Sequence, residues 1–131
     1  MNLASSNYKI LIVESSSMIV ERMNILLAEM NCIDSIATAF SYGEALEKLN
    51  QEKFDVVLLD TQLPGKNGFE LLSFIKMNYP AVKTIILTNQ TSDFYRNKGH
   101  VIGSDHFIDK SNEFEKVVDI IKDYAVGYQM N

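Results

Sequence analysis

Four polar residues stand where apolar runs of the sequence end, and together their types could do chemistry. They are Glu14 after residues 8–13, Asp60 after 54–59, Thr88 at the end of 83–88, and Lys110 after 106–109. Two carboxylates suit a divalent ion such as Mg²⁺, which takes one or two carboxylates together with phosphate oxygens. A carboxylate can also act as a nucleophile and form an aspartyl-phosphate, while an ammonium and a hydroxyl stabilise the transferred group. The set therefore suggests phosphoryl chemistry centred on Asp60.

The apolar runs that precede these residues predict strands. Each run is short, apolar on both faces and bounded by turn residues, which is typical of a strand buried on both faces. The run before Asp60 contains a single polar residue, Asp55, and leads into a loop with Pro64, Gly65 and Gly68. A more polar run at 34–39 predicts a fifth strand, nearer an edge of the sheet.

Apolar residues at helical spacing predict five helices between and after these strands. The predicted helices cover residues 18–30, 41–50, 69–78, 91–102 and 112–126. Ser41 and Glu44 form a capping box at the start of the second helix. Gly103 predicts a left-handed cap at the end of the fourth helix, whose sequence is the poorest helix former of the five.

Five strands alternating with five helices predict an α/β fold, a parallel sheet with helices on both faces. The carboxyl ends of parallel strands form one rim of the sheet, where open α/β folds bind their ligands. Glu14, Asp60, Thr88 and Lys110 are therefore expected at one site. Each residue alone is equally well explained as the polar end of a strand, but the convergence of all four favours a functional site.

The composition narrows the class of protein. With 131 residues, 47% of them apolar, the chain is expected to form one domain with a core at 8–126. A net charge of −5 without a cluster of Lys and Arg argues against nucleic-acid binding. The apolar runs are too short to insert in a membrane, and the first residues lack a secretory signal. Cys32 is the single cysteine, which fits the cytoplasm as the expected location, and the scattered His and Cys residues argue against zinc.

On these motifs the chain resembles a response-regulator receiver domain of two-component signalling over nearly its full length. The segments that carry the resemblance are Ile10–Glu14, Asp55–Asp60 with Leu63, Pro64 and Gly68, Ile85–Thr88, and Gly103–Lys110. Their order and spacing together are highly specific, although each segment alone is weak. The resemblance implies a flavodoxin-like, doubly wound sheet of strand order 2-1-3-4-5, which would place Glu14 and Asp60 on adjacent strands.

The resemblance also implies roles for particular residues. Asp60 would accept a phosphoryl group from a sensor histidine kinase or a phosphotransfer protein, and Lys110 would contact that group. Thr88 and Phe107 would be the switch residues, although Phe107 is equally well explained as a core phenylalanine. Mg²⁺ would be held by Glu14, Asp60 and the backbone carbonyl of Gln62, with Ser15 as a further candidate.

The family's output surface corresponds here to residues 91–126, the fourth helix, fifth strand and fifth helix. This face would contact a downstream protein target, an effector domain or a second copy in a homodimer, with Phe94, Tyr95 and Tyr124 as candidate contact residues or as partly buried core. The implied role is regulatory, with no enzyme activity beyond self-catalysed phosphoryl transfer and dephosphorylation.

Three residues depart from the family's pattern. Ser15 stands where the family has a second acid, so we expect Mg²⁺ to bind weakly, and we expect the longer Glu14 to reach inward. Ser111 replaces the family's proline, so we expect a trans bond after Lys110, because a cis bond before a non-proline residue costs about 2.5–4 kcal/mol. Asn89 is larger than the family's usual residue after the switch hydroxyl and is expected to narrow access to the site.

Other functions remain open on the sequence alone. A pseudo-receiver would bind a partner regardless of phosphate. An FMN-binding flavodoxin-like electron carrier could hold a phosphate at Ser15–Ser17, but it would leave Asp60 and Lys110 unused. A hydrolase with an aspartate nucleophile is disfavoured because Gln62 stands where its second aspartate would be. The sequence is compatible both with a stand-alone regulator and with part of a longer one.

Overall fold

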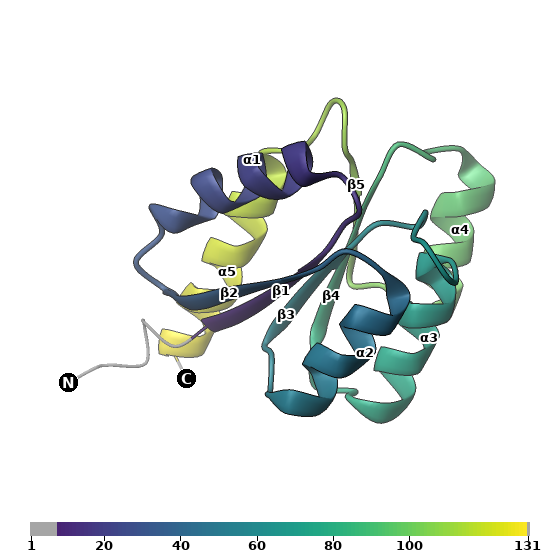
Figure 1. The fold of residues 1–131 in the computed structure, drawn as a ribbon. Coiled ribbons are helices and arrows are strands. Elements are labelled where there is room, and N and C mark those ends of the chain that lie inside the picture. Colours follow the sequence, from purple (N-terminus) through teal and green to yellow (C-terminus); the bar gives the residue numbers. More distant parts are fainter. Residues whose placement is uncertain (1–7, 131) are drawn as a thin grey trace.

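The computed structural model describes residues 8–130 and the side chains of residues 8–125. Five strands alternate with five helices along this part of the chain (Figure 1). The elements are β1 Tyr8–Val13, α1 Ser17–Ala28, β2 Ile33–Ala39, α2 Tyr42–Gln51, β3 Val56–Leu59, α3 Gly68–Asn78, β4 Lys83–Thr88, α4 Asp93–Ile102, β5 His106–Asp109 and α5 Lys116–Met130.

The strands form one parallel sheet in the order β2-β1-β3-β4-β5, which confirms the predicted α/β architecture. Helices α1 and α5 cover one face of the sheet, and α2, α3 and α4 cover the other (Figure 1). The side chains of β1 point alternately into these two layers. Ile10 and Ile12 pack with α1 and α5, whereas Leu11 and Val13 pack with the opposite layer. A strand buried on both faces therefore needs an unbroken apolar run, as the sequence has here.

Several predicted boundaries differ from the structure, most of them by one or two residues and those of the last helix by four. The third strand begins at Val56 rather than at Phe54, and the last helix begins at Lys116 rather than at Asn112. Asp109 explains the second difference, because its carboxylate accepts hydrogen bonds from the backbone N–H groups of Ser111 and Asn112 and fixes a turn there. Such side-chain bonds to the backbone compete with helix formation. The helix then starts only after this turn.

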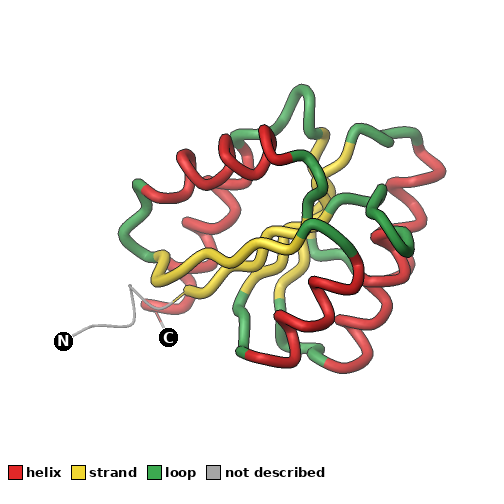
Figure 2. The backbone as a smooth tube through the Cα atoms, in the orientation of Figure 1, coloured by secondary structure: helices red, strands yellow, loops and turns green. Residues whose placement is uncertain are grey.

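The loops of the sheet's carboxyl rim are separated from those of the opposite rim by the length of the strands (Figure 2). Gly103 ends α4 with φ +119°, in the left-handed region, and its N–H bonds to Gly99 O, so the predicted cap is confirmed. Within residues 8–130, none of the helices is both long and apolar enough to span a membrane.

Candidate functional site

Glu14, Asp60 and Lys110 meet at the carboxyl ends of β1, β3 and β5. All three side chains are buried, with relative exposures of 2%, 5% and 8%. Lys110 Nζ lies 2.8 Å from Asp60 Oδ2 and 2.8 Å from Glu14 Oε1. Two acids with one ammonium carry a formal charge of −1 in a site largely closed to water. The predicted convergence of these residues is thus present.

Backbone hydrogen bonds fix these residues at the rim, because the sheet pairing continues one residue beyond each strand. Asp60 N donates to Val13 O at 3.0 Å, and Lys110 N donates to Thr88 O at 2.9 Å. Glu14 N donates to Ala39 O at 3.0 Å. The polar side chains therefore leave a rigid, paired backbone, which is the arrangement that gives a site a precise geometry.

The ammonium of Lys110 is held in its charged form. Burial by itself would lower the pKa of Lys110, but the contacts with Asp60 and Glu14 and their negative charges outweigh burial, so the pKa is raised. A buried charge is tolerated only when it is paired in this way. Lys110 is therefore a fixed positive charge beside both carboxylates.

The carboxylate of Glu14 reaches inward, as expected from its extra methylene. One oxygen, Oε2, accepts a hydrogen bond from Ser16 N at 3.0 Å. The other, Oε1, approaches Lys110 off the direction that a hydrogen bond requires, and no described residue gives this buried atom a hydrogen bond. Glu14 Oε1 is thus held by its ion pair with Lys110, and a carboxylate oxygen in that state can accept one further donor or cation.

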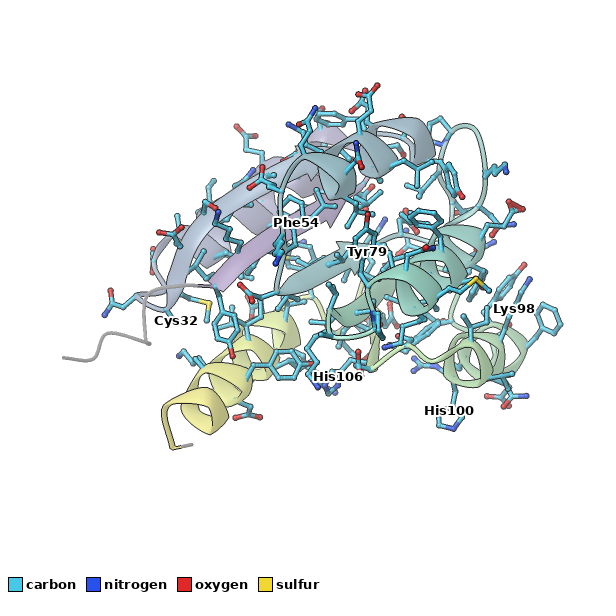
Figure 3. The ribbon with its side chains drawn as sticks, turned by 90° about the horizontal axis from the view of Figure 1, so that it is seen from below. Cys32, Phe54, Tyr79, Lys98, His100 and His106 are labelled. Carbon is cyan, nitrogen blue, oxygen red and sulfur yellow. The ribbon has the colours of Figure 1, made fainter. Side chains whose placement is uncertain are left out.

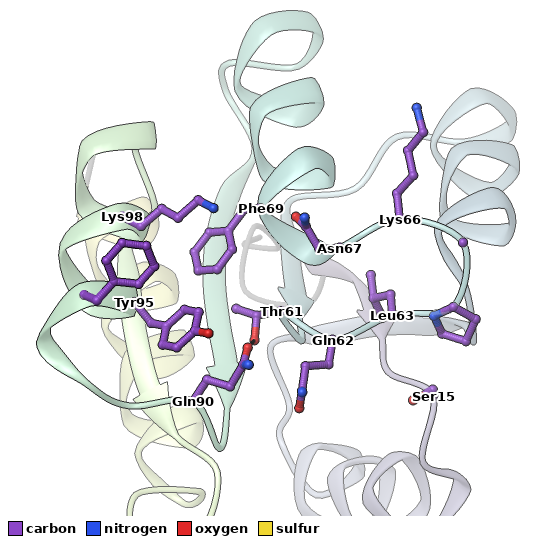
Figure 4. Close-up of a pocket in the computed structure, with 13 residues that line it drawn as sticks. Ser15, Thr61, Gln62, Leu63, Lys66, Asn67, Phe69, Gln90, Tyr95 and Lys98 are labelled. Carbon is purple, nitrogen blue, oxygen red and sulfur yellow. Dashed lines mark hydrogen bonds between the residues drawn. The ribbon is translucent and has the colours of Figure 1, made fainter.

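The hydroxyl of Thr88 is bonded to Thr61, a residue that the sequence analysis did not select. The two Oγ1 atoms are 2.7 Å apart, and Thr61 Oγ1 donates to Gln90 Oε1 at 2.7 Å. Gln90 N donates to Thr88 Oγ1 at 3.0 Å. Figure 4 shows Thr61 and Gln90 pointing toward each other beside the loop after β3. Two features of the sequence could have indicated this network. Thr61 is a polar residue directly after Asp60, and Gln90 is an amide two residues after Thr88.

Phe107 is half-buried and lies under α4. Its ring packs against the hydrophobic core between the sheet and α2–α4, and the Arg96 guanidinium lies 4.9 Å from the ring centroid. A Cβ at Gly99 would come within 3.4 Å of the Phe107 ring and 2.8 Å of Ile86. Gly99 therefore lets α4 sit close on β4 and β5, and the ring partly belongs to the core.

The loop after Asp60 is held by close backbone packing. Gly68 N donates to Thr61 O at 2.8 Å, and the Asn67 side chain caps α3 by accepting from Glu70 N at 3.0 Å. A Cβ on Gly68 would lie 1.9 Å from Asp60 O. Only glycine fits where the start of α3 meets the backbone of the candidate nucleophile.

A groove of about 660 Å³ runs beside this loop. Its lining includes Ser15, Thr61 and Gln62 at one end and Phe94, Tyr95 and Lys98 at the other. Figure 4 shows that the side chains come from the loop after β3, the start of α3, the segment before α4, α4 itself and the segment after β1. The groove therefore lies beside the buried site, and its lining includes Thr61 and Gln62, which follow Asp60 in the chain, but not Asp60 itself.

Two of the residues that depart from the family's pattern bond to each other. Ser111 Oγ donates to Asn89 Oδ1 at 2.8 Å, and both residues are exposed. No cis peptide bond occurs in the described chain, so the bond between Lys110 and Ser111 is trans, as expected. This contact ties the loop after β4 to the loop after β5 across the rim.

The donor set for a metal ion is small. Among the described residues, no three His, Cys, Asp or Glu side chains gather as a metal-binding group. Ser15 is exposed and carries no charge. The acids at the site are therefore Glu14 and Asp60, which are both buried. The open oxygen of Glu14 fits a hard cation that keeps most of its waters, as Mg²⁺ does. Cys32, His100 and His106 lie on separate parts of the molecule (Figure 3), which does not suit zinc.

Comparisons of this chain with a family model, with related sequences and with solved structures agree on one family. The family model of the response regulator receiver domain matches residues 10–122. The chain is 30% identical to the transcriptional regulatory protein MalR of Bacillus subtilis over 115 residues, which are 88% of this chain and 49% of MalR, so it spans about half of that relative. It is 24% identical to protein PilG of Pseudomonas aeruginosa over 95% of this chain and 92% of PilG. The BeF3-activated receiver domain of DrrB, a Thermotoga maritima protein, is 26% identical with a TM-score of 0.80, over 89% of this chain and 96% of that domain.

Proposed function

Because this chain belongs to the response-regulator receiver domain family of two-component signalling, we propose that it accepts a phosphoryl group on Asp60. The observation that carries the proposal is the contact of Lys110 Nζ with Asp60 and Glu14, at 2.8 Å from each carboxylate. Phosphoryl transfer to an aspartate needs a carboxylate as nucleophile and a positive charge that stabilises the transferred group. Asp60 and Lys110 would supply these two, and Glu14 would add a second acid.

The two oxygens of Asp60 are held differently, and this difference selects the attacking atom. Asp60 Oδ2 pairs with Lys110, whereas Oδ1 accepts one long hydrogen bond from Gln62 N at 3.3 Å. Oδ1 is therefore the freer nucleophile. It forms the new O–P bond while the donor's bond from phosphorus to its leaving group breaks, and the leaving group takes the electron pair of that bond. Lys110 neutralises charge on the phosphoryl oxygens.

Glu14, Asp60 and the backbone carbonyl of Gln62 would hold Mg²⁺ at this site, and Ser15 would offer a hydroxyl where the family has a second acid. When bound, the ion neutralises negative charge on the phosphoryl group. Two acids and a hydroxyl in place of a third carboxylate predict weak binding, because a serine hydroxyl is a poorer ligand for a hard cation than a carboxylate.

The proposed donor is a sensor histidine kinase or a phosphotransfer protein, and the proposed output passes through α4, β5 and α5 to a downstream protein, an effector domain or a second copy. Phe94 on α4 is 68% exposed and offers an apolar contact there. We expect the site to act in the cytoplasm, where such donors lie. A second candidate is the pseudo-receiver, which the exposed serine at position 15 favours.

Intact-mass measurement after incubation with Mg²⁺ and acetyl phosphate tests the proposal. Wild type should gain one phosphoryl group, and Asp60→Asn should gain none. Asp34→Asn is the matched control, because Asp34 is an exposed aspartate on β2, and it should be modified like wild type. Absence of an Asp60-dependent adduct at any Mg²⁺ concentration would leave the pseudo-receiver as the better description. A purified protein with flavin absorbance would instead support the FMN carrier.

A further inference from the structure

We propose that Thr61 and Gln90 form a latch that holds the hydroxyl of Thr88 in the unphosphorylated state and so restrains phosphorylation. The inference rests on the proposed function, since it concerns the regulation of the Asp60 site. Thr61 and Gln90 are positioning residues in this proposal, because they act through Thr88 and touch no phosphoryl group.

The direction of the hydrogen bonds follows from counting protons. The carbonyl oxygen of Gln90 can only accept, so the single hydroxyl proton of Thr61 is given to Gln90 Oε1 at 2.7 Å. Thr61 therefore has no proton left for Thr88, and the contact of 2.7 Å between the two hydroxyls requires Thr88 to donate to Thr61. The only hydroxyl proton of Thr88 is thus committed to Thr61.

The lone pairs of Thr88 are engaged as well. Gln90 N donates to Thr88 Oγ1 at 3.0 Å, so the same residue binds Thr88 through its backbone and binds Thr61 through its side chain. Three hydrogen bonds close a ring among Thr61, Thr88 and Gln90. A ring of this kind fixes the χ1 angle of Thr88, because any rotation breaks two of its bonds together.

Burial makes the latch difficult to open without a substitute partner. Thr61 is 2% exposed and Thr88 is fully buried, so water does not readily replace a lost bond. An unpaired buried hydroxyl is costly, so the Thr88 hydroxyl leaves Thr61 only when another acceptor takes its proton. A phosphoryl oxygen on Asp60 would supply such a partner. Phosphorylation and the Thr61 hydroxyl therefore compete for the same proton of Thr88.

The latch also links the site to the start of α4. Gln90 stands three residues before Asp93, where α4 begins, and the N-cap residue Ser92 makes no side-chain cap bond to any described residue. Thr61, Gln90, Phe94 and Tyr95 all line the groove beside the loop after β3. Release of Gln90 would thus loosen a segment that leads directly to Phe94, an exposed aromatic residue of α4.

The test uses Thr61→Val, which removes the hydroxyl at nearly constant volume, and Thr61→Ser, which keeps it. The first readout is the χ1 rotamer of Thr88, from the three-bond couplings of its γ-methyl carbon to the backbone nitrogen and carbonyl carbon in the phosphate-free protein. Wild type and Thr61→Ser should show one rotamer, and Thr61→Val should show averaging. A single wild-type rotamer in Thr61→Val would overturn the latch.

The second readout is the initial rate of adduct formation with acetyl phosphate at fixed Mg²⁺. Loss of one buried hydrogen bond corresponds to a change of roughly two- to tenfold, so Thr61→Val should react faster than wild type by about that factor. Thr61→Ser should match wild type. An unchanged or slower rate in Thr61→Val, or an equal change in both variants, would overturn the proposal.

Gln90→Met provides an independent route should Thr61→Val fail to fold. It removes the acceptor of the Thr61 proton, so Thr61 can donate to Thr88 and free the Thr88 proton for a phosphoryl oxygen. We expect faster adduct formation, and a rate equal to that of wild type would contradict the latch. The absence of any adduct in all variants would instead refute the role of Asp60, while the rotamer measurement still decides whether the latch exists.

Discussion

The ends of β1 and β3 place two buried carboxylates at the same distance from one ammonium, but they are supported very differently. Asp60 is followed by Thr61, a buried residue bonded to Thr88 and Gln90. Glu14 is followed by Ser15, which is exposed, and its Oε1 receives no hydrogen bond from the described residues. The end of β3 is thus enclosed by a polar network, whereas the end of β1 has spare acceptor capacity and one acid only.

In terms of the proposed function, the candidate phosphoacceptor Asp60 has a supporting polar network, and the candidate metal-binding side at Glu14 and Ser15 lacks one. Lys110 pairs with both carboxylates, so one ammonium serves Asp60 and Glu14 together. The proposed function therefore predicts that Asp60 stays reactive although Mg²⁺ binds weakly. The predictions below alter one part at a time, beginning with the residue that both carboxylates share.

Lys110→Met should have the largest effect, because it leaves two buried carboxylates without their partner. Breaking a buried ion pair from one side costs about 3–5 kcal/mol, and the free energy of unfolding in urea should fall by that amount at pH 7. Lys116→Met is the control, since that side chain is 62% exposed and its pair with Glu113 is a surface pair. The control should change stability by less than about 1 kcal/mol. Equal losses in the two variants would contradict the shared role of Lys110.

Gly68→Ala should disturb the β3 end selectively. Its new Cβ would meet Asp60 O at 1.9 Å, so the loop must shift, at a cost of about 1–3 kcal/mol for overpacking. Gly43→Ala is the matched control in α2, where nothing lies within 4 Å of the new Cβ. That variant should be at least as stable as wild type, because alanine is the better helix residue and Gly43 lies in the first turn of α2. Thermal unfolding of both variants measures the contrast, and a stable Gly68→Ala would show that the contact at Asp60 relaxes freely.

Ser15→Asp should strengthen the β1 end by adding the missing acid. We expect Mg²⁺ to bind about tenfold more tightly, a gain of about 1.4 kcal/mol, as followed by NMR shifts of the Asp60 and Gln62 amides during a titration. Ser17→Asp adds the same charge to an exposed position in the first turn of α1. If both variants gain equally, general charge rather than the ligand position explains the effect.

Alkaline pH should weaken the fold gradually. The pKa of Lys110 is raised from 10.5, and the pKa of Tyr124 is raised from 10.0 to about 12, mainly by burial and then by the charges of Asp105 and Tyr8. The folded state therefore binds more protons than the unfolded state above pH 10, so stability is complete below that pH and falls as pH rises through the folded-state values. Urea unfolding from pH 8 to 12 should show this decline, with a shallower slope for Tyr124→Phe. An identical slope for that variant would exclude Tyr124 as a source.

The parallel sheet was predictable because the apolar runs are short, continuous and each followed by a polar residue, whereas its strand order 2-1-3-4-5 came from the resemblance to the receiver family. The same pattern predicted that Glu14, Asp60 and Lys110 would meet. The boundary of the last helix was predicted wrongly, because Asp109 binds the backbone of residues 111 and 112 and delays the helix until Lys116. Hydrogen bonds from a side chain to the nearby backbone compete with helix formation. The spacing of apolar residues does not reveal them.

The Thr61 network could not be predicted in the same way. It depends on the rotamers of three side chains from two neighbouring strand ends, and nothing in the spacing of Thr61, Thr88 and Gln90 specifies which hydroxyl donates to which. Likewise, the ion pair of Glu14 with Lys110 depends on how far one extra methylene reaches. The sequence therefore predicts that these groups lie at the rim of the sheet. Which of them bond to each other is visible only in the three-dimensional structure.

The most direct test of the account is the rate of Asp60 phosphorylation by acetyl phosphate as a function of Mg²⁺ concentration. A complete nucleophile beside a depleted metal site predicts an Asp60-dependent adduct whose rate keeps rising with Mg²⁺, with half-saturation above about 1 mM. Ser15→Asp should shift that midpoint to lower concentration. Saturation well below 1 mM in wild type, or no adduct at any Mg²⁺ concentration, would contradict the account.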